Sequence, residues 1–355
     1  MTQLDRVREA VARAKLGALL LMDDKNIYYA CGFMPTDSAA LITPERAWLI
    51  TDSRYTEDAA RSCYSGVEIL LNSNAQPMMQ TLARLCAGIE GDIGAEETKL
   101  SHLAWLNLER AIGRGLIGAD AVISGLRARK TRAELETLIH AQRIAEAALE
   151  AVLPMIKPGL TERELAAELT YQMMRRGSER NSFDPIAITG AHTSMPHGVP
   201  GEGVIKAGDF VTMDFGCVYH GYCSDMTRTV AVGSATDEMR NVYDTVLRAQ
   251  LAGIAAAKPS ATGAEVHAAG AKVIADAGYG EYFGHGFGHG VGLDVHESPN
   301  ANPRNDKPLG EGALISAEPG IYIPGKFGVR IEDVIYLSGG GNENITRAPK
   351  ELIIL

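Results

Sequence analysis

The sequence predicts an α+β protein of two domains, a small α/β domain followed by a larger domain with an antiparallel sheet flanked by paired helices. Its 355 residues are more than one domain usually holds. Over residues 1–126, short apolar runs alternate with stretches of helical periodicity, which is typical of a sheet covered by helices. Over residues 127–355, four longer helical stretches alternate with strand-like segments rich in Gly, Val and Ile. We place the domain boundary just before the first of these long helices.

The first domain is expected to contain a mostly buried sheet. Apolar runs predict its strands at Ala18–Met22, Ala39–Ile42, Ala47–Thr51, Val67–Leu71 and Gly91–Gly94. Amphipathic stretches between them predict helices at Asp5–Leu16, Tyr55–Cys63, Gln76–Leu85 and Ser101–Ile112. The segment contains neither a phosphate-binding loop nor a dinucleotide fingerprint, so the sequence does not predict a nucleotide site.

Four helices are expected in the second domain. They begin near Thr131, at Thr161, near Asp237 and at Thr262. The first is expected to end at Pro158-Gly159 and the fourth at Gly278, because these residues stop helices. Thr161 and Thr262 are each followed three positions later by a glutamate, which forms a capping box at the helix start. The segments between and after these helices are predicted to pair as an antiparallel sheet.

The formal net charge of -10 excludes nucleic acid and anionic membrane as the main partners. Both would require clustered Lys and Arg to neutralise phosphate. No apolar run approaches the roughly 20 residues that a membrane-spanning helix needs. Acidity of this size mainly keeps a protein soluble, and it does not identify a partner.

Cysteine usage and the first residues indicate a cytoplasmic protein. The five cysteines are odd in number and form no CxxC motif, which favours reduced, buried thiols. The N-terminal segment is charged through its first half, and its apolar run Leu16–Met22 has no small-residue cleavage site after it. We therefore expect a helix followed by a buried strand there, and not a signal peptide.

Two aspartates lie in the segment DFVTMDFGCVYHGYCSDMTRTVAVG, residues 209–233, which is predicted to form a hairpin. A turn at residues 219–220 would pair Asp214 with Asp225, whereas a turn at 220–221 would set Gly216 opposite Asp225. In both registers the two carboxylates share a face of the sheet; a three-residue loop would separate them. Carboxylates on one face repel unless a proton or a cation lies between them. Their apolar neighbours favour such a site over two exposed aspartates.

Three histidines lie in the glycine-rich segment GHGFGHGVGLDVHE, residues 284–297. They are His285, His289 and His296. The glycine spacing is not that of a dinucleotide fingerprint, and the HExxH motif of many zinc peptidases is absent. A single histidine is usually structural, but three within twelve residues favour a functional site.

Two glutamates lie in the segment ISAEPGIYIPGKFGVRIEDVIYL, residues 315–337, which is predicted to form a second hairpin. Pairing Ile323 with Val329 would set Gly320 opposite Glu332. One face of this hairpin would then carry Glu318, Tyr322, Arg330 and Glu332. Taken alone, the hairpin is also compatible with an exposed ladder of arginine and glutamate.

Taken together, these segments supply a set of metal ligands. The candidates are Asp214, Asp225, His289, Glu318 and Glu332. Four carboxylates and one imidazole suit a pair of Mn, Co or Zn ions, because all but the histidine are hard oxygen ligands and none is a thiolate. Four negative charges also balance two divalent cations, which would allow a hydroxide to bridge the ions at neutral pH.

The order of these motifs resembles that of the metal-dependent peptidases with the pita-bread fold. Along the chain, two aspartates eleven residues apart are followed by a GHG histidine, an EPG glutamate and an RIED glutamate. This family includes Xaa-Pro aminopeptidase, Xaa-Pro dipeptidase (prolidase), methionine aminopeptidase and creatinase. The resemblance covers roughly the last 225 residues. The preceding part resembles, more weakly, the creatinase-type N-terminal domain of the proline-specific members.

The resemblance implies a role for each site residue. Asp214 would bind one metal ion, Asp225 and Glu332 would bridge both, and His289 and Glu318 would bind the other. Glu318 would also act as general base and proton shuttle. His197, in SMPHGVPG, would stabilise the oxyanion or contact the leaving group, and His296 would bind substrate and handle protons. His285, Tyr322 and Arg330 would line the substrate pocket.

The resemblance further implies a cytoplasmic metallo-exopeptidase that cleaves after an N-terminal residue when proline follows. Its cofactors would be two divalent ions, Mn before Co or Zn, and its substrates would be peptides with a free N-terminus. Residues 1–126 would mediate a homodimer and narrow access to the site. The alternatives are a broader or methionine-type aminopeptidase and a catalytically silent binding homologue. The extra N-terminal domain argues against a methionine-type aminopeptidase, and the complete ligand set argues against a silent homologue.

Overall fold

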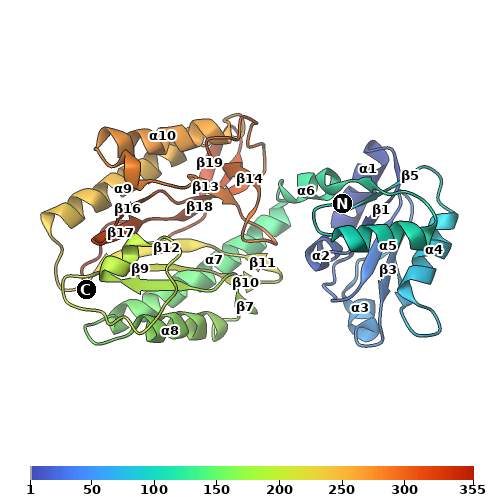
Figure 1. The fold of residues 1–355 in the computed structure, drawn as a ribbon, viewed down its shortest axis with the longest axis horizontal. Coiled ribbons are helices and arrows are strands. Elements are labelled where there is room, and N and C mark those ends of the chain that lie inside the picture. The colour runs from blue at the N-terminus through green and yellow to red at the C-terminus, as the bar shows by residue number, and fades with distance from the viewer. Residues whose placement is uncertain (1) are drawn as a thin grey trace. The chain divides into compact units, whose positions relative to one another are not determined.

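The computed structural model describes residues 2–355. They form two compact units that divide between Arg127 and Ala128, and each unit has its own apolar core. The two units are described separately below, with elements labelled as in Figure 1. No helix among the described residues is long and apolar enough to cross a membrane.

The first unit is a six-stranded sheet in the order β4-β3-β2-β1-β5-β6. Its strands are β1 (Leu16–Leu21), β2 (Ala39–Ile42), β3 (Ala47–Thr51), β4 (Val67–Leu71), β5 (Asp92–Ala95) and β6 (Ile117–Gly118). Its helices are α1 (Gln3–Arg13), α2 (Asp24–Cys31), α3 (Thr56–Ser62), α4 (Met78–Ala87), α5 (His102–Ile112) and α6 (Asp120–Arg127). β2 pairs antiparallel with β1 and β3, and the other pairs are parallel. The α/β prediction is therefore confirmed.

The five predicted strands and four predicted helices of this unit are present with slightly shifted ends, but α2, β6 and α6 were missed. α2 is short, and its signals are its caps. The side chain of Asp23 accepts a hydrogen bond from the backbone of Asn26 at the start, and Gly32 adopts a left-handed φ of 83° at the end. Eight residues between such caps carry too little periodicity to stand out beside a buried strand.

The second unit contains two helix pairs with strands between them. The helices are α7 (Arg132–Val152), α8 (Glu162–Met174), α9 (Asp237–Ala256) and α10 (Gly263–Asp276), with 3₁₀ turns η1 (Leu153–Met155), η2 (Gly190–Ser194) and η3 (Gly280–Tyr282). Figure 1 shows α7 and α8 on one side of the strands and α9 and α10 on the other. The four predicted helices are confirmed, and capping boxes are formed at Thr131, Thr161 and Thr262. α7 ends at Val152, earlier than predicted, because the chain tightens into η1.

The strands of this unit pair antiparallel throughout. They are β7 (Arg180–Asn181), β8 (Ile186–Thr189), β9 (Phe210–Phe215), β10 (Cys217–Tyr219), β11 (Tyr222–Cys223), β12 (Met226–Ala231), β13 (Gly288–Gly290), β14 (Glu297–Ala301), β15 (Leu314–Ala317), β16 (Gly320–Ile323), β17 (Phe327–Arg330), β18 (Asp333–Ser338) and β19 (Gly341–Asn344). One core cluster joins α7 and α8 to β9 and β12 through Leu149, Leu169, Met213, Phe215 and Val230. Another joins α9 to β16 and β17. This arrangement is the predicted antiparallel sheet flanked by paired helices.

The first hairpin adopts one of the two registers considered. Asp214 lies opposite Thr227, and Val218 lies opposite Cys223. The turn is therefore at His220 and Gly221, whose positive φ values of 45° and 76° match a type I′ turn. The register that paired Asp214 directly with Asp225 is wrong.

The second hairpin has a tighter turn than predicted. Ile323 pairs with Phe327, not with Val329, and Gly320 lies opposite Arg330. The loop therefore has three residues, with Gly325 at a φ of 73° that favours glycine. The predicted register was wrong by two residues. Because strand residues alternate with period two, a shift of two keeps each side chain on its predicted face.

Candidate active site

A cavity of about 1260 Å³ opens in the second unit, and the chemistry-bearing residues converge on it. Its wall includes His197, Asp214, Asp225, His285, His289, His296, Glu318, Arg330 and Glu332. Of the residues predicted to form the site, Tyr322 alone is not part of this wall, but it contacts two residues that are. The structure thus brings together residues that span more than 130 positions of the sequence.

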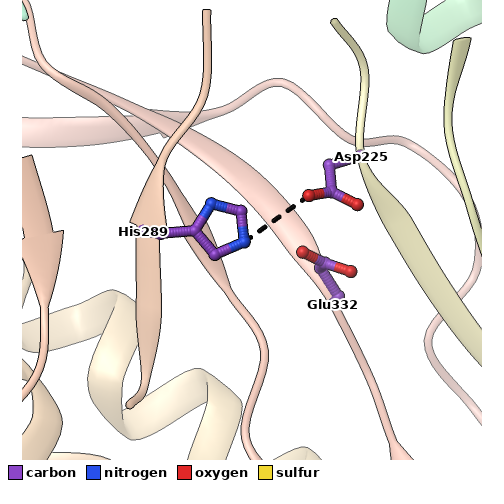
Figure 2. A group of neighbouring side chains, drawn as sticks. All are labelled: Asp225, His289 and Glu332. Carbon is purple, nitrogen blue, oxygen red and sulfur yellow. Dashed lines mark ion pairs between the residues drawn. The ribbon is translucent and has the colours of Figure 1, made fainter. Parts of the chain in front are cut away.

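The centre of the cluster is formed by Asp225, His289 and Glu332, drawn in Figure 2. One ligand atom from each lies within 4.8 Å of the other two, a spacing that can hold a metal ion. The Nε2 atom of His289 is 3.6 Å from the carboxylate of Asp225. Asp225 precedes β12, His289 is in β13, and Glu332 precedes β18. Three strands therefore meet at this point.

Glu318 flanks this centre on the side of His289. Its Oε1 atom is 3.1 Å from Nε2 of His289 and accepts a hydrogen bond from the Ser316 hydroxyl. The same hydroxyl accepts a hydrogen bond from the backbone N–H of His289 at 3.0 Å. Ser316 thus fixes the glutamate and the histidine relative to each other.

Asp214 is held by Arg330. The guanidinium donates to Oδ2 of Asp214 at 2.5 Å and to the Tyr322 hydroxyl at 2.9 Å, and its Nε donates to the Thr227 hydroxyl at 3.1 Å. The Tyr322 hydroxyl also lies 2.9 Å from Nε2 of His285. One arginine therefore ties an acidic residue of the cluster to a phenol and an imidazole of the pocket.

Sequence reasoning missed Thr227. Its hydroxyl donates to Oε2 of Glu332 at 2.8 Å, and its backbone carbonyl accepts from the N–H of Glu332 at 3.1 Å. Thr227 lies two residues after Asp225, so strand alternation places both on one face, and that spacing was the available signal.

The cavity also includes His267, on α10, which sequence reasoning did not assign to the site. Its ring stacks on Phe283, with ring centroids 5.4 Å apart. Phe283 in turn meets the His285 ring edge-on at 5.0 Å. Helical periodicity alone could not show which side of α10 faces a cavity.

The electrostatics of the cluster favour a cation. Burial raises the pKa of Asp225 and Glu332 well above the ordinary carboxyl range, and neighbouring carboxylates raise it further. Burial also raises the pKa of Asp214, although the positive charge of Arg330 partly lowers it. Oδ1 of Asp214 and Oε1 of Glu332 are buried with no hydrogen-bond partner among the described residues. Buried, unpaired carboxylate oxygens are costly, and a bound divalent ion would satisfy them.

Glu318 and His289 behave as an ion pair. Burial disfavours the charged form of Glu318, but the hydrogen bond and charge of His289 outweigh it and lower the pKa of Glu318 to about 2. Burial likewise opposes the charged form of His289, while Glu318 and Asp225 raise the pKa of the imidazole to about 9. A divalent ion bound between these two side chains would replace the positive charge of the protonated His289 ring.

The glycines around His289 allow the strands to approach closely. A Cβ atom on Gly288 would lie 2.0 Å from the carbonyl oxygen of Ser316, and one on Gly290 would lie 2.6 Å from that of Glu297. β13 can therefore lie between β14 and β15 only if these positions lack side chains. Strand packing therefore explains Gly288 and Gly290.

Comparison with known proteins places this site in a family. The model described as metallopeptidase family M24 matches residues 136–338, which include every residue of the cluster. The chain belongs to metallopeptidase family M24. A second model, the creatinase/prolidase N-terminal domain, matches residues 3–129. The fold is thus the pita-bread domain of this family preceded by a creatinase-type domain, as predicted.

Similar proteins match this M24 chain along its whole length. An uncharacterized peptidase of Bacillus subtilis is 39% identical, over 99% of this chain and 100% of its own. The structure titled Xaa-Pro dipeptidase from Bacillus anthracis is 42% identical, with a TM-score of 0.94 over 99% of each chain. The X-Pro aminopeptidase from Thermotoga maritima is 34% identical, with a TM-score of 0.93 over all of both chains. Family membership establishes a metal-dependent peptidase that acts on peptides.

Proposed function

We propose that this protein is a metallo-exopeptidase that hydrolyses the bond between an N-terminal residue and a following proline. It would act as an Xaa-Pro dipeptidase or an Xaa-Pro aminopeptidase. The observation that carries this proposal is the buried cluster of four carboxylates and one imidazole in a cavity that also holds His197, His285 and His296. The similarity to proteins titled Xaa-Pro dipeptidase and X-Pro aminopeptidase supports the same substrate class.

The cluster residues would hold two divalent ions, with Mn the first candidate and Co and Zn next. Asp225 and Glu332 would bridge the ions, Asp214 would complete one coordination sphere, and His289 and Glu318 would complete the other. The unpaired oxygens of Asp214 and Glu332 fit this assignment. When bound, such ions polarise the scissile carbonyl and lower the pKa of a water molecule.

The remaining side chains would bind and orient the peptide. Proline makes the scissile bond a tertiary amide, so the departing nitrogen has no proton and must receive one. His197 and His296 lie on the cavity wall and would deliver it. Burial lowers the pKa of His296, as does the charge of His289, so its imidazole would have to take up a proton before it delivers one. Glu318 would take up the proton released by the attacking water.

The pocket beyond the cluster would be formed by His285, Tyr322 and Arg330. Burial lowers the pKa of His285, which keeps its ring uncharged, and raises the pKa of Tyr322 to about 12, which keeps its hydroxyl protonated. Hydrogen bonds that the Tyr322 hydroxyl makes with His285 and Arg330 fix these three side chains relative to one another. A proline ring would lie beside them. The acidic cluster complements the positive charge of a free peptide N-terminus.

A substrate panel tests the proposal. Chelated protein is assayed with Xaa-Pro dipeptides, Xaa-Pro-Yaa peptides and Met-Ala peptides, each after refilling with Mn, Co or Zn. We expect hydrolysis of the Xaa-Pro bond, and none without metal. Preference for Met-Ala would support a methionine-type aminopeptidase. Metal binding without hydrolysis of any peptide would support a silent binding homologue.

We also propose that the protein is a cytoplasmic homodimer in which residues 1–126 mediate assembly and narrow access to the site. The five cysteines are free thiols, of which four are buried, and free thiols suit a reducing compartment. The match to the creatinase/prolidase N-terminal domain supports the dimer, because the family resemblance implies that this domain mediates assembly. Light scattering on a sizing column tests it, and the mass of a single chain would exclude the dimer.

A further inference from the structure

We propose that Glu162, which lies outside the cavity, is a positioning residue that holds His197 in place for catalysis. This inference rests on the proposed function, in which His197 acts on the scissile bond. His197 is carried by the segment between η2 and residue 203. Its side chain is exposed on the cavity wall and makes no hydrogen bond or ion pair among residues 2–355. The backbone that carries it therefore sets the direction of its Cα–Cβ bond and the region that the ring can reach.

Glu162 holds that backbone on both sides of His197. Its Oε1 atom accepts hydrogen bonds from the backbone N–H of Thr189 at 2.9 Å and from Nδ1 of His192 at 2.8 Å. Its Oε2 atom accepts one from the backbone N–H of Gly201 at 3.0 Å. One carboxylate thus closes the loop from residue 189 to residue 201, with His197 between the two ends.

The carboxylate is itself firmly fixed. Glu162 is the first residue of α8 and only 2% exposed, and the positive end of the helix dipole favours a negative charge there. The backbone of α8 adds two hydrogen bonds to the same loop, from the N–H groups of Glu162 and Arg163 to the carbonyls of Gly203 and Gly201. A Cβ atom on Gly203 would lie 2.9 Å from the Glu162 carboxylate, so the loop packs directly on it.

The opposite side of the loop is tied to the cluster. The Arg330 guanidinium donates to the carbonyl oxygen of Pro196 at 3.3 Å, immediately before His197. Gly328, in β17, donates its backbone N–H to the Thr193 hydroxyl at 2.8 Å. His197 therefore lies between a fixed arginine on one side and the Glu162 contacts on the other. Removing the Glu162 carboxylate leaves the loop with the Arg330 contact, the Gly328–Thr193 hydrogen bond and the two backbone hydrogen bonds from α8.

The alternative is that Glu162 only stabilises the fold. The two readings differ in one respect: a positioning residue acts through His197, so its effect on rate disappears when His197 is absent. A residue that matters only for folding would lower activity equally with or without the imidazole. A double-mutant cycle separates them.

The test compares wild type with Glu162→Gln, His197→Ala and the double variant, each refilled with the same metal. Glutamine keeps one acceptor oxygen but presents an N–H₂ group to another N–H donor, so one end of the loop is released. We expect Glu162→Gln to lower kcat by about 10–100-fold with KM changed less than about threefold, since a misplacement of about 1 Å has effects of this size. The double variant should match His197→Ala within about twofold. Glu164→Gln, on the same helical turn but exposed, is the control and should leave kcat unchanged.

A second measurement needs no substrate. NMR signals of the His197 ring, assigned with His197→Ala, should broaden or split in Glu162→Gln and stay sharp in Glu164→Gln. If Glu162→Gln does not fold, the His192→Phe variant is used in its place. This substitution removes the contact between His192 and Glu162, one of the three carboxylate contacts, and keeps a ring of similar volume. It should lower kcat several-fold, again only when His197 is present.

Several results would overturn the inference. These are multiplicative losses in the double variant, full activity of His197→Ala, and unchanged ring signals in the positioning variant. Failure of the proposed function looks different. If the wild type cleaves another peptide class, the cycle is run on that peptide, and if it cleaves none, the NMR comparison decides on positioning alone.

Discussion

Replacing Glu332 by glutamine should make the metal-free protein more stable and remove most of its stabilisation by metal. Glu332 is 1% exposed, and its Oε1 atom has no hydrogen-bond partner among the described residues. Glutamine has the same shape and can still accept the hydrogen bond from Thr227. The substitution therefore removes a charge at the proposed bridging position and little else.

The substitution should raise the stability of the metal-free protein but lower the stabilisation that metal binding provides. Burial and the neighbouring carboxylates raise the pKa of Glu332 in the folded state, so the stability associated with this group is fully present at low pH. It falls as the pH rises from the ordinary pKa of a glutamate toward the raised pKa. Metal-free Glu332→Gln should thus equal wild type in acid and exceed it at pH 8. With metal, the missing ligand should dominate and reverse the order.

The metal effect can be estimated from linkage. A ligand at a hundred times its Kd stabilises the folded state by about 2.7 kcal/mol. For a unit the size of residues 128–355, this corresponds to a rise in Tm of about 5–11 °C. If the substitution weakens binding a hundredfold, the stabilisation falls to about 0.4 kcal/mol, and the rise to about 1–2 °C.

Differential scanning fluorimetry of chelated protein, with and without Mn at pH 5 and pH 8, measures both effects. Glu343→Gln, an exposed residue of β19, is the matched control and should respond to Mn as the wild type does. A full Mn-dependent rise in the Glu332→Gln variant would refute the proposal that this carboxylate binds metal. Lower stability of the metal-free variant at pH 8 would refute the electrostatic argument.

Three further predictions concern residues around the site. Arg228→Met should destabilise the protein by about 3 kcal/mol in thermal or urea unfolding, because it removes the ion pair to Asp333 at 2.7 Å, leaving this buried carboxylate only Lys350 and Asn344, and removes hydrogen bonds to four backbone carbonyls; a change below about 1 kcal/mol would contradict this. Tyr322→Phe should lower kcat/KM by about tenfold without altering bound metal, because it removes one hydrogen bond from Arg330 and one contact to His285; loss of metal from this variant would show a different role. Arg304 lies on the cavity wall, and its guanidinium has no partner among residues 2–355. Arg304→Gln should therefore raise KM for an Xaa-Pro dipeptide and not for its C-terminal amide, and equal changes for both would exclude a carboxylate contact.

The fold was largely predictable because its signals are local. Capping boxes at Thr161 and Thr262 marked helix starts that the structure confirms. The register of the second hairpin was not predictable, because the sequence between Ile323 and Val329 is compatible with loops of three or five residues. The observed three-residue loop goes with the packing of β16 and β17 against α9, which involves residues far away in the sequence.

The candidate ligands could be predicted because four carboxylates among apolar strands have few other uses. The contacts that orient these ligands could not be predicted from the sequence. Thr227 looks like an ordinary strand residue, and Glu162 looks like an ordinary acidic residue in the first turn of a helix. Their roles depend on which segments lie beside them: Glu332 lies 105 residues from Thr227, and Gly201 lies 39 residues from Glu162.

The most direct test of the account is a manganese titration of chelated protein in which bound metal and hydrolysis of an Xaa-Pro dipeptide are followed together. We expect two ions bound per chain, no hydrolysis before metal is added, and activity that rises with occupancy. Hydrolysis that persists at zero occupancy, or a protein that binds no divalent ion, would contradict the central claim that these five side chains form a catalytic metal site.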